Sequence, residues 1–186
     1  MDDEVWAKII LMEKTNTLGK AYIRSPVFMV DGSDSGFDGQ KVGVNGFRRE
    51  DEDNDSLMVK TLIEEGCRLK LTQNGDILIK RDDNLNIFLY QNKESCSSDV
   101  VSKLPYGLIQ QDKTYKLFDM KKFQELLSEE LQSDHINWCS LERQVVFLHI
   151  FLHYLIDYQE CFRPSRCFLL QNSLRIFCSL LSGSWW

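Results

Sequence analysis

Two histidines and two cysteines near the end of the chain are residue types that bind zinc. His149 and His153 are four residues apart, a spacing that places both imidazoles on one face of a helix. Cys161 and Cys167 would complete a set of four ligands. An isoleucine follows His149, so the glutamate general base of an HExxH metalloprotease is missing. We favour two histidines with local hydrogen bonds on an apolar helix, and keep zinc binding as the alternative hypothesis.

A stretch rich in aspartate, serine and glycine has the start of a calcium-binding loop. Asp31, Ser33, Ser35 and Gly36 fit its first six positions. The twelfth position is Val42, where such loops carry a bidentate glutamate, and no helix precedes the stretch. We therefore predict a polar turn rather than a calcium site.

Arg48 and Arg49 are followed by a run of acids at residues 50–55. Acids at a helix N-terminus are favourable by roughly 0.3–1 kcal/mol, so this run needs no ligand to explain it. Guanidinium groups bind carboxylates and phosphates through paired hydrogen bonds, so the two arginines are candidates to contact a phosphopeptide or a carboxylate-rich partner. A solvated surface pair is the simpler interpretation.

The sequence contains no arrangement typical of catalysis. It has no GxSxG stretch and no glycine-rich phosphate loop, and its three histidines all lie late in the chain. We predict that the protein is not an enzyme and has no cofactor. A net charge of −6 argues against direct nucleic-acid binding and against binding to anionic membranes. Six scattered cysteines and an acidic N-terminus favour reduced thiols and a location in the cytoplasm or the nucleus.

Alternating and short apolar runs predict that the elements carrying these residues are mostly β-strands. The clearest signal is Asn74-Gly75 between two alternating runs, which predicts a β-hairpin with a type I′ turn. The expected strands are 5–12, 18–24, 27–30, 40–44, 67–71, 77–80, 86–90 and 115–118, and we expect the 86–90 strand to pair next to the hairpin.

Two helices are expected. One has an apolar stripe at helical spacing and ends at Gly66, and the other begins after Asp119 as its N-cap. The stripe of the first helix consists of Leu57, Met58, Thr61, Leu62 and Ile63.

Residues 145–186 are apolar and lack lysine. The longest uncharged run is about a dozen residues, whereas a transmembrane helix needs roughly 20. We predict a helical layer here, either a replacement helix that covers an open sheet edge or an atypical or truncated continuation of the chain.

Six short motifs between residues 4 and 144 follow one another in the order found in a known family. They are Trp6 in the first strand, Val30-Asp31-Gly32, the VGVNG stretch at 42–46, IEEGC at 63–67, GDILIK at 75–80 and KLFDM at 116–120. In this order they resemble the C-terminal Mad-homology-two domain of the Smads, and most of all its divergent Expansion branch. The resemblance implies a mainly β protein with some α-helix, a Smad- or forkhead-associated-like β-sandwich with a loop-and-helix cap at one end and helices at the other. It also implies protein binding without enzymatic activity.

Two features of the Smads are not matched. In that family an aspartate of the VDG stretch pairs across a trimer with an arginine; Asp31 fits the aspartate, but Gly39 stands at the arginine position. One half of the pair is missing, so trimer assembly is not expected from the resemblance. The phosphorylated SSxS tail is also absent, so activation by C-terminal phosphorylation is not expected.

The sequence therefore predicts a Smad-like sandwich domain at residues 1–144 and an apolar helical segment at 145–186. We expect an interaction module that acts as a signalling adaptor or transcription regulator and binds other proteins or phosphopeptides. Loops on a rigid scaffold are the usual place for recognition, so we place the partner surface on the 31–39 loop and the arginine pair. Its candidate residues are Asp31, Asp34, Asp38, Arg48 and Arg49. A sheet edge that binds a peptide by strand addition is the other option for this surface.

Overall fold

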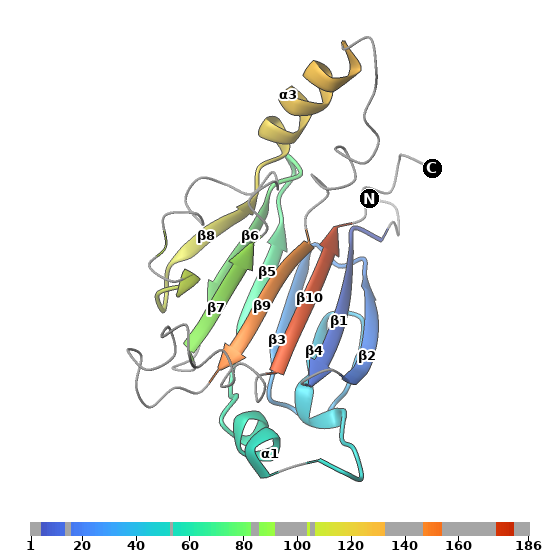
Figure 1. The fold of residues 1–186 in the computed structure, drawn as a ribbon, viewed down its shortest axis with the longest axis vertical. Helices are drawn as coiled ribbons and strands as arrows, with labels where there is room; N and C mark the ends of the chain where they lie inside the picture. Colours follow the sequence, from blue (N-terminus) through green and yellow to red (C-terminus); the bar gives the residue numbers. More distant parts are fainter. Residues whose placement is uncertain are drawn as a thin grey trace, which may run out of the picture.

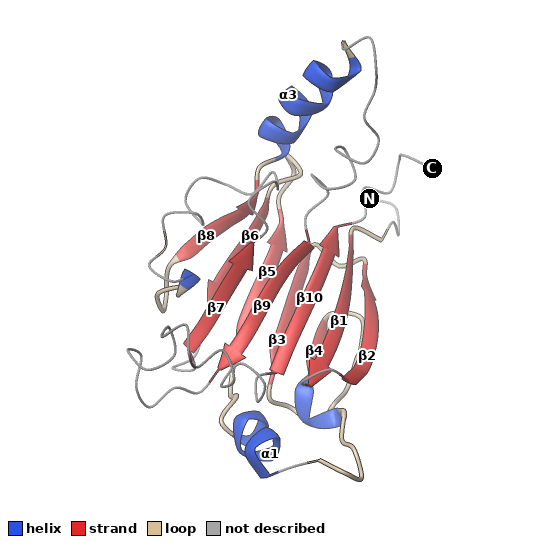
Figure 2. Cartoon of the chain, in the orientation of Figure 1, coloured by secondary structure: helices blue, strands red, loops and turns tan. Residues whose placement is uncertain are grey.

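The computed structural model of the 186-residue chain describes residues 5–13, 16–52, 54–82, 86–91, 104, 107–132, 147–153 and 174–180. Within these ranges, ten strands form two five-stranded sheets that face each other (Figures 1 and 2). The first sheet has the order β2-β1-β10-β9-β7 and the second the order β4-β3-β5-β6-β8. The strands are β1 Ala7–Glu13, β2 Asn16–Ile23, β3 Val27–Asp31, β4 Lys41–Gly43, β5 Cys67–Leu71, β6 Ile77–Arg81, β7 Asn86–Gln91, β8 Thr114–Phe118, β9 Phe147–His153 and β10 Leu174–Leu180.

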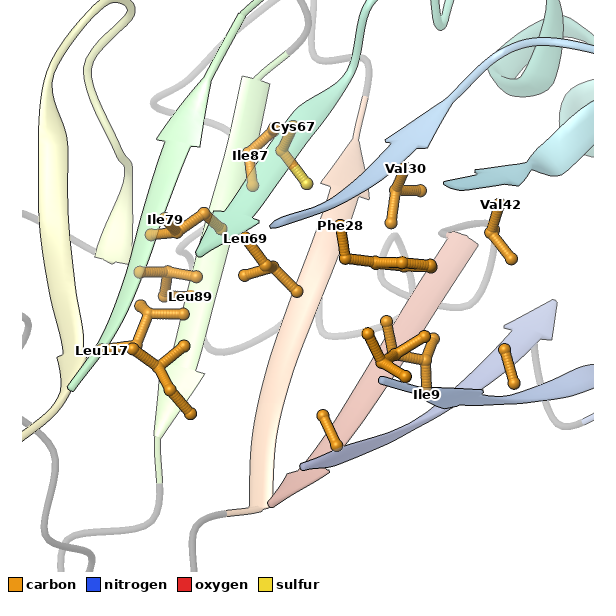
Figure 3. Close-up of a cluster of buried hydrophobic side chains, with 14 of the residues drawn as sticks. Ile9, Phe28, Val30, Val42, Cys67, Leu69, Ile79, Ile87, Leu89 and Leu117 are labelled. Carbon is orange, nitrogen blue, oxygen red and sulfur yellow. The ribbon is translucent and has the colours of Figure 1, made fainter. Parts of the chain in front are cut away.

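The core lies between the inner faces of the two sheets. Alternate residues of β1 are buried, as are alternate residues of β5 and β6, which is the period expected of strands with one face inward. Figure 3 shows side chains from both sheets meeting in this layer, among them Ile9, Phe28, Leu69 and Ile87. Each fully buried aliphatic side chain stabilises the fold by roughly 1.5–3 kcal/mol, so this layer holds the sandwich together.

The hairpin predicted at Asn74-Gly75 is confirmed, but its turn type is different. β5 and β6 pair antiparallel, with Leu71 opposite Ile77. Of the two turn residues only Gly75 has a positive φ, at 82°, whereas a type I′ turn needs two. The amide of Gly75 donates to the carbonyl of Thr72 at 3.1 Å, and the Thr72 amide donates to the carbonyl of Asp76 at 2.9 Å. These bonds describe a three-residue loop, in which a type I turn is followed by a left-handed glycine.

The predicted pairing of the 86–90 strand with the hairpin is wrong. β7 does not extend the sheet of the hairpin; it pairs with β9 in the opposite sheet, with Ile87 opposite Leu152. The position beside β6 is taken by β8, with Ile79 opposite Tyr115. Consecutive strands often pair, but a sandwich also needs crossings between its sheets, and local sequence does not mark where the chain crosses.

The helical prediction for residues 145–186 is wrong where the structure describes that segment. Phe147–His153 and Leu174–Leu180 are strands β9 and β10, and both lie in the interior of the first sheet. β10 pairs with β1 along its whole length, from Ala7 opposite Leu180 to Glu13 opposite Leu174. A short run that is apolar at successive positions fits a central strand as well as a buried helix, so periodicity did not distinguish the two.

Among the described residues, two α-helices and one short 3-10 helix lie at the ends of the sandwich. Helix α1 (Asn54–Thr61) and the 3-10 helix η1 (Val44–Gly46) lie at one end, and helix α3 (Met120–Leu131) projects from the other (Figure 1). The predicted N-cap of α3 is confirmed, because the Asp119 side chain accepts from the amides of Lys121 and Lys122. Within the described ranges, neither helix is long and apolar enough to span a membrane.

Helix α1 occurs where it was expected, but only part of its predicted apolar stripe faces the core. Leu57, Met58 and Thr61 are exposed. The buried positions are Ser56, Val59, Lys60 and, just after the helix, Ile63. The buried face has helical spacing but includes a serine and a lysine.

Candidate interaction surface

The predicted partner surface lies at the end of the sandwich that carries η1 and α1. The loop after β3 is held there by close backbone packing: the Gly32 amide donates to the carbonyl of Glu64 at 3.1 Å, and the Gly43 amide to the carbonyl of Gly36 at 2.6 Å. A Cβ atom at Gly32 would lie 1.7 Å from the carbonyl oxygen of Ile63. The glycine of the VDG stretch is thus required by this approach, which fixes the loop on the segment that follows α1.

Asp31 organises the start of this loop. Its Oδ1 accepts from the amide of Ser33 at 3.0 Å and from the Ser33 hydroxyl at 2.6 Å. Its Oδ2 pairs with Lys41 Nζ at 3.4 Å, and the same amine lies 3.3 Å from the Ser33 hydroxyl. The Asp31 carboxylate is therefore engaged within its own chain.

Arg48 and Asp34 are brought together by the fold. Their side chains form an ion pair, with Arg48 Nη2 3.4 Å from Asp34 Oδ1, although 14 residues separate them in sequence. The neighbouring Asn45 side chain donates to the carbonyl of Gly32, which links the same two segments a second time. The two charged side chains are 70% and 78% exposed, so water screens the pair and a partner can displace either member at small cost.

Asp38 has a different position and a local role. Its carboxylate accepts from the amides of Gln40 at 2.9 Å and Lys41 at 2.8 Å, in the turn that leads into β4. The amides of Gln40 and then Lys41 lower the pKa of Asp38 below its ordinary value, because they stabilise the carboxylate form. Gly39 follows with a φ of 95°, a conformation that an arginine side chain would strain.

Arg49 does not join the loop but pairs with Asp51. Its Nε donates to Asp51 Oδ1 at 2.9 Å, and its Nη2 contacts Oδ2. The hydrogen-bonded guanidinium lowers the pKa of Asp51, and the carboxylate raises the pKa of Arg49. Of the five predicted site residues, the fold thus pairs Asp34 with Arg48, while Asp31, Asp38 and Arg49 make local contacts in their own turns.

A buried ion cluster beside this surface was missed by the sequence analysis. The Lys60 amine contacts Glu13 Oε2 at 3.1 Å and the carbonyl of Phe47 at 3.0 Å, and it also pairs with Glu52. All three ionic side chains are at most 5% exposed. Alternation in β1 could have indicated it, since Glu13 follows Ala7, Ile9 and Leu11 on the inward face.

The zinc hypothesis has no support from the structure. His149 and His153 lie on strand β9, where a separation of four residues spans about 13 Å at roughly 3.3 Å per residue. That spacing does not bring two imidazoles to one ion as a helix turn would. Cys161 and Cys167 lie outside the described residues. A search of the described ranges found no group of three or more metal-ligating side chains.

Comparison with known proteins places this architecture in a family. The family model described as "MH2 domain" matches residues 4–172. The match covers well over half of the chain, so the protein belongs to the MH2 domain family, and the resemblance to the Smad domain is confirmed. The match also continues past residue 144, the predicted end of the Smad-like domain, and includes β9. The chain is a protein-interaction module of the Smad type.

Two solved structures with TM-scores above 0.6 support the fold. The crystal structure of the interferon regulatory factor 9 IAD domain is 12% identical with a TM-score of 0.61, covering 97% of this chain and 84% of that one. The crystal structure of STAT2 in complex with IRF9 is 13% identical with a TM-score of 0.64, covering 98% and 94%. An engineered FHA domain with a Myc-pTBD peptide is 6% identical with a TM-score of 0.43, covering 97% and 94%. A comparison with curated protein sequences found no match.

Proposed function

We propose that this protein is a non-enzymatic signalling adaptor or transcription regulator that works in the cytoplasm or the nucleus. Its partner surface is the 31–39 loop together with Arg48 and Arg49. MH2 family membership supports protein binding as the activity. The observation that carries the choice of surface is the Arg48–Asp34 pair, which joins two separate segments at one end of a rigid sandwich.

Arg48 is the recognition residue of this surface. It is far more exposed than Arg49, whose side chain is 26% exposed and held by Asp51. A carboxylate or phosphate on the partner binds Arg48 by replacing Asp34, because a guanidinium forms paired hydrogen bonds with either group. Asp31, Lys41 and Ser33 hold the loop in place behind it.

Affinity capture with three versions of the full chain tests this surface. Arg48→Glu reverses the recognising charge, and Lys121→Glu reverses an exposed positive charge on α3, at the far end of the sandwich. We expect partners retained by the wild type and by Lys121→Glu to bind Arg48→Glu at least about tenfold more weakly, as measured afterwards by titration with purified components. Equal binding to all three versions would contradict the proposed surface.

The type of anionic group is then tested with paired peptides from a captured partner. A peptide with and without phosphate on its serine or threonine is titrated into the wild type. Phosphate-dependent affinity that is lost in Arg48→Glu supports a phosphopeptide, while phosphate-independent affinity that is lost in the same variant supports a carboxylate-rich segment.

A further inference from the structure

We propose that the outer face of α1 is a docking surface for a basic, amphipathic segment of a partner protein. This α1 face consists of Leu57, Met58 and Thr61. The inference rests on the proposed function as an interaction module and adds a second contact, of opposite charge, at the same end of the sandwich.

The first observation is that α1 exposes two large apolar side chains and buries a charged one. Leu57 is 38% and Met58 52% exposed, while Lys60 is 1% exposed. A surface helix normally buries its apolar side chains and leaves lysine in water. Folding alone does not favour this arrangement, because it desolvates a charge and leaves large apolar side chains in solvent. An apolar outer face is typical of a surface that a partner covers.

The second observation is that α1 is fixed from behind. Lys60 ties the helix to Glu13 at the end of β1 and to the Phe47 carbonyl, and Val59 lies in the core. A helix held in this way presents Leu57 and Met58 in one arrangement before a partner arrives. Such preorganisation reduces the entropy that is lost on binding.

The third observation is the charge around the α1 face. Acids flank the helix along the chain on both sides, Glu50 before it and Glu64 and Glu65 after it. Of the neighbouring cations, Arg49 is paired with Asp51 and Arg48 with Asp34. A basic segment complements this acidic rim, and its apolar residues contact Leu57 and Met58, where the flexible methionine adapts to their shape. A second copy of the chain fits poorly, because each copy carries a net charge of −6.

The test measures binding of a fluorescent peptide by anisotropy. The probe is a leucine–lysine peptide of about 14 residues, four helical turns long, with leucine on one face. We expect it to bind the wild-type chain, with an affinity that falls as salt is added. We expect affinity to fall at least about tenfold in Leu57→Ser/Met58→Ser, and also in the charge-reversed variant Glu50→Lys/Glu65→Lys.

Tyr22→Ser is the matched control. Tyr22 is 48% exposed, similar to Met58, but it lies on β2 beside Lys8, whose amine is 5.8 Å from the ring centroid. Loss of the Tyr22 ring should change the affinity for the peptide by less than about twofold, because the positive charge of Lys8 beside it does not attract a basic peptide. Far-ultraviolet circular dichroism and urea unfolding of each variant verify that it is folded.

Three results would overturn the inference. The first is that the leucine–lysine peptide does not bind, or binds all variants equally. The second is that a leucine–glutamate peptide binds as well as the basic one. The third is that light scattering finds a dimer that Leu57→Ser/Met58→Ser dissociates, which would make a second copy the occupant. The variant Arg48→Glu distinguishes failure of this inference from failure of the proposed function. If partner capture depends on Arg48 but no peptide binds at α1, only the inference is refuted.

Discussion

Helices α1 and α3 lie at opposite ends of the sandwich and are fixed to it in opposite ways (Figure 2). α1 buries a lysine whose amine pairs with Glu13 and Glu52. α3 buries none of its residues; Met120, Phe123 and Leu126 are only half-buried against the core. α1 is thus held by a side-chain ion cluster behind it, while α3 is held mainly through its first turn.

The first turn of α3 is fixed by two carboxylates. Asp119 caps the helix, and Asp76 of the β5–β6 turn accepts from the Met120 amide at 3.0 Å. Lys116 lies between the two acids, 2.7 Å from Asp76 and 3.2 Å from Asp119. Asp76 and then Asp119 raise the pKa of Lys116, so this amine stays charged. The comparison predicts that α1 is sensitive to loss of a buried charge and α3 to loss of its cap.

The largest effect is expected for Lys60→Met. The substitution leaves two buried carboxylates without a cation, and removal of one partner from a buried ion pair costs about 3–5 kcal/mol. Urea unfolding should show a much lower midpoint. The control is Lys121→Met on α3, whose side chain is 85% exposed and whose amine lies 3.7 Å from Glu125; we expect a change of about 0.5 kcal/mol or less there.

A triple variant identifies the cause of this loss. Lys60→Met combined with Glu13→Gln and Glu52→Gln removes all three charges, so it should regain much of the stability that the single substitution loses. If the triple variant is less stable than Lys60→Met, the cluster contributes through packing and hydrogen bonds rather than through charge balance.

A smaller effect is expected for Asp119→Ala. Loss of an N-cap carboxylate costs about 1 kcal/mol. Amide hydrogen exchange should become faster along α3 and remain unchanged in α1. Asp119→Asn is the control, because asparagine caps about as well as aspartate. Equal losses in both variants would assign the stabilisation to the Lys116 ion pair instead of the cap.

Acid should weaken the same cap. The amide of Lys122, followed by the Lys116 amine, lowers the pKa of Asp119 below its ordinary value of about 3.9. The stabilisation is therefore present above about pH 4 and is lost as pH falls through the lowered pKa of the folded state. Urea unfolding from pH 7 to pH 2 should show a smaller acid-dependent loss in Asp119→Asn than in the wild type.

The sequence predicted the elements that carry local signals. The Asn74-Gly75 hairpin, the Asp119 cap and most strand positions are confirmed. It did not predict which sheet β7 joins or that β9 and β10 are strands, because both depend on contacts between distant parts of the chain. At the candidate surface it named Arg48 and Asp34 but could not pair them across 14 residues. It predicted an apolar stripe on α1 but not the burial of Lys60, since no local pattern indicates that Glu13 and Glu52 lie beside this amine.

The smallest effect is expected on the outer face of α1, and it sharpens the contrast between the two helices. Leu57→Ser and Met58→Ser should each change the free energy of unfolding by about 0.5 kcal/mol or less, because both side chains are substantially exposed. Val59→Ala, one position further along and buried, should cost about 1.5 kcal/mol, since it removes two core carbon atoms. Urea midpoints of the three variants measure the difference. A large loss in Leu57→Ser would mean that this side chain supports the fold itself, and the exposed apolar face of α1 would then need no partner to explain it.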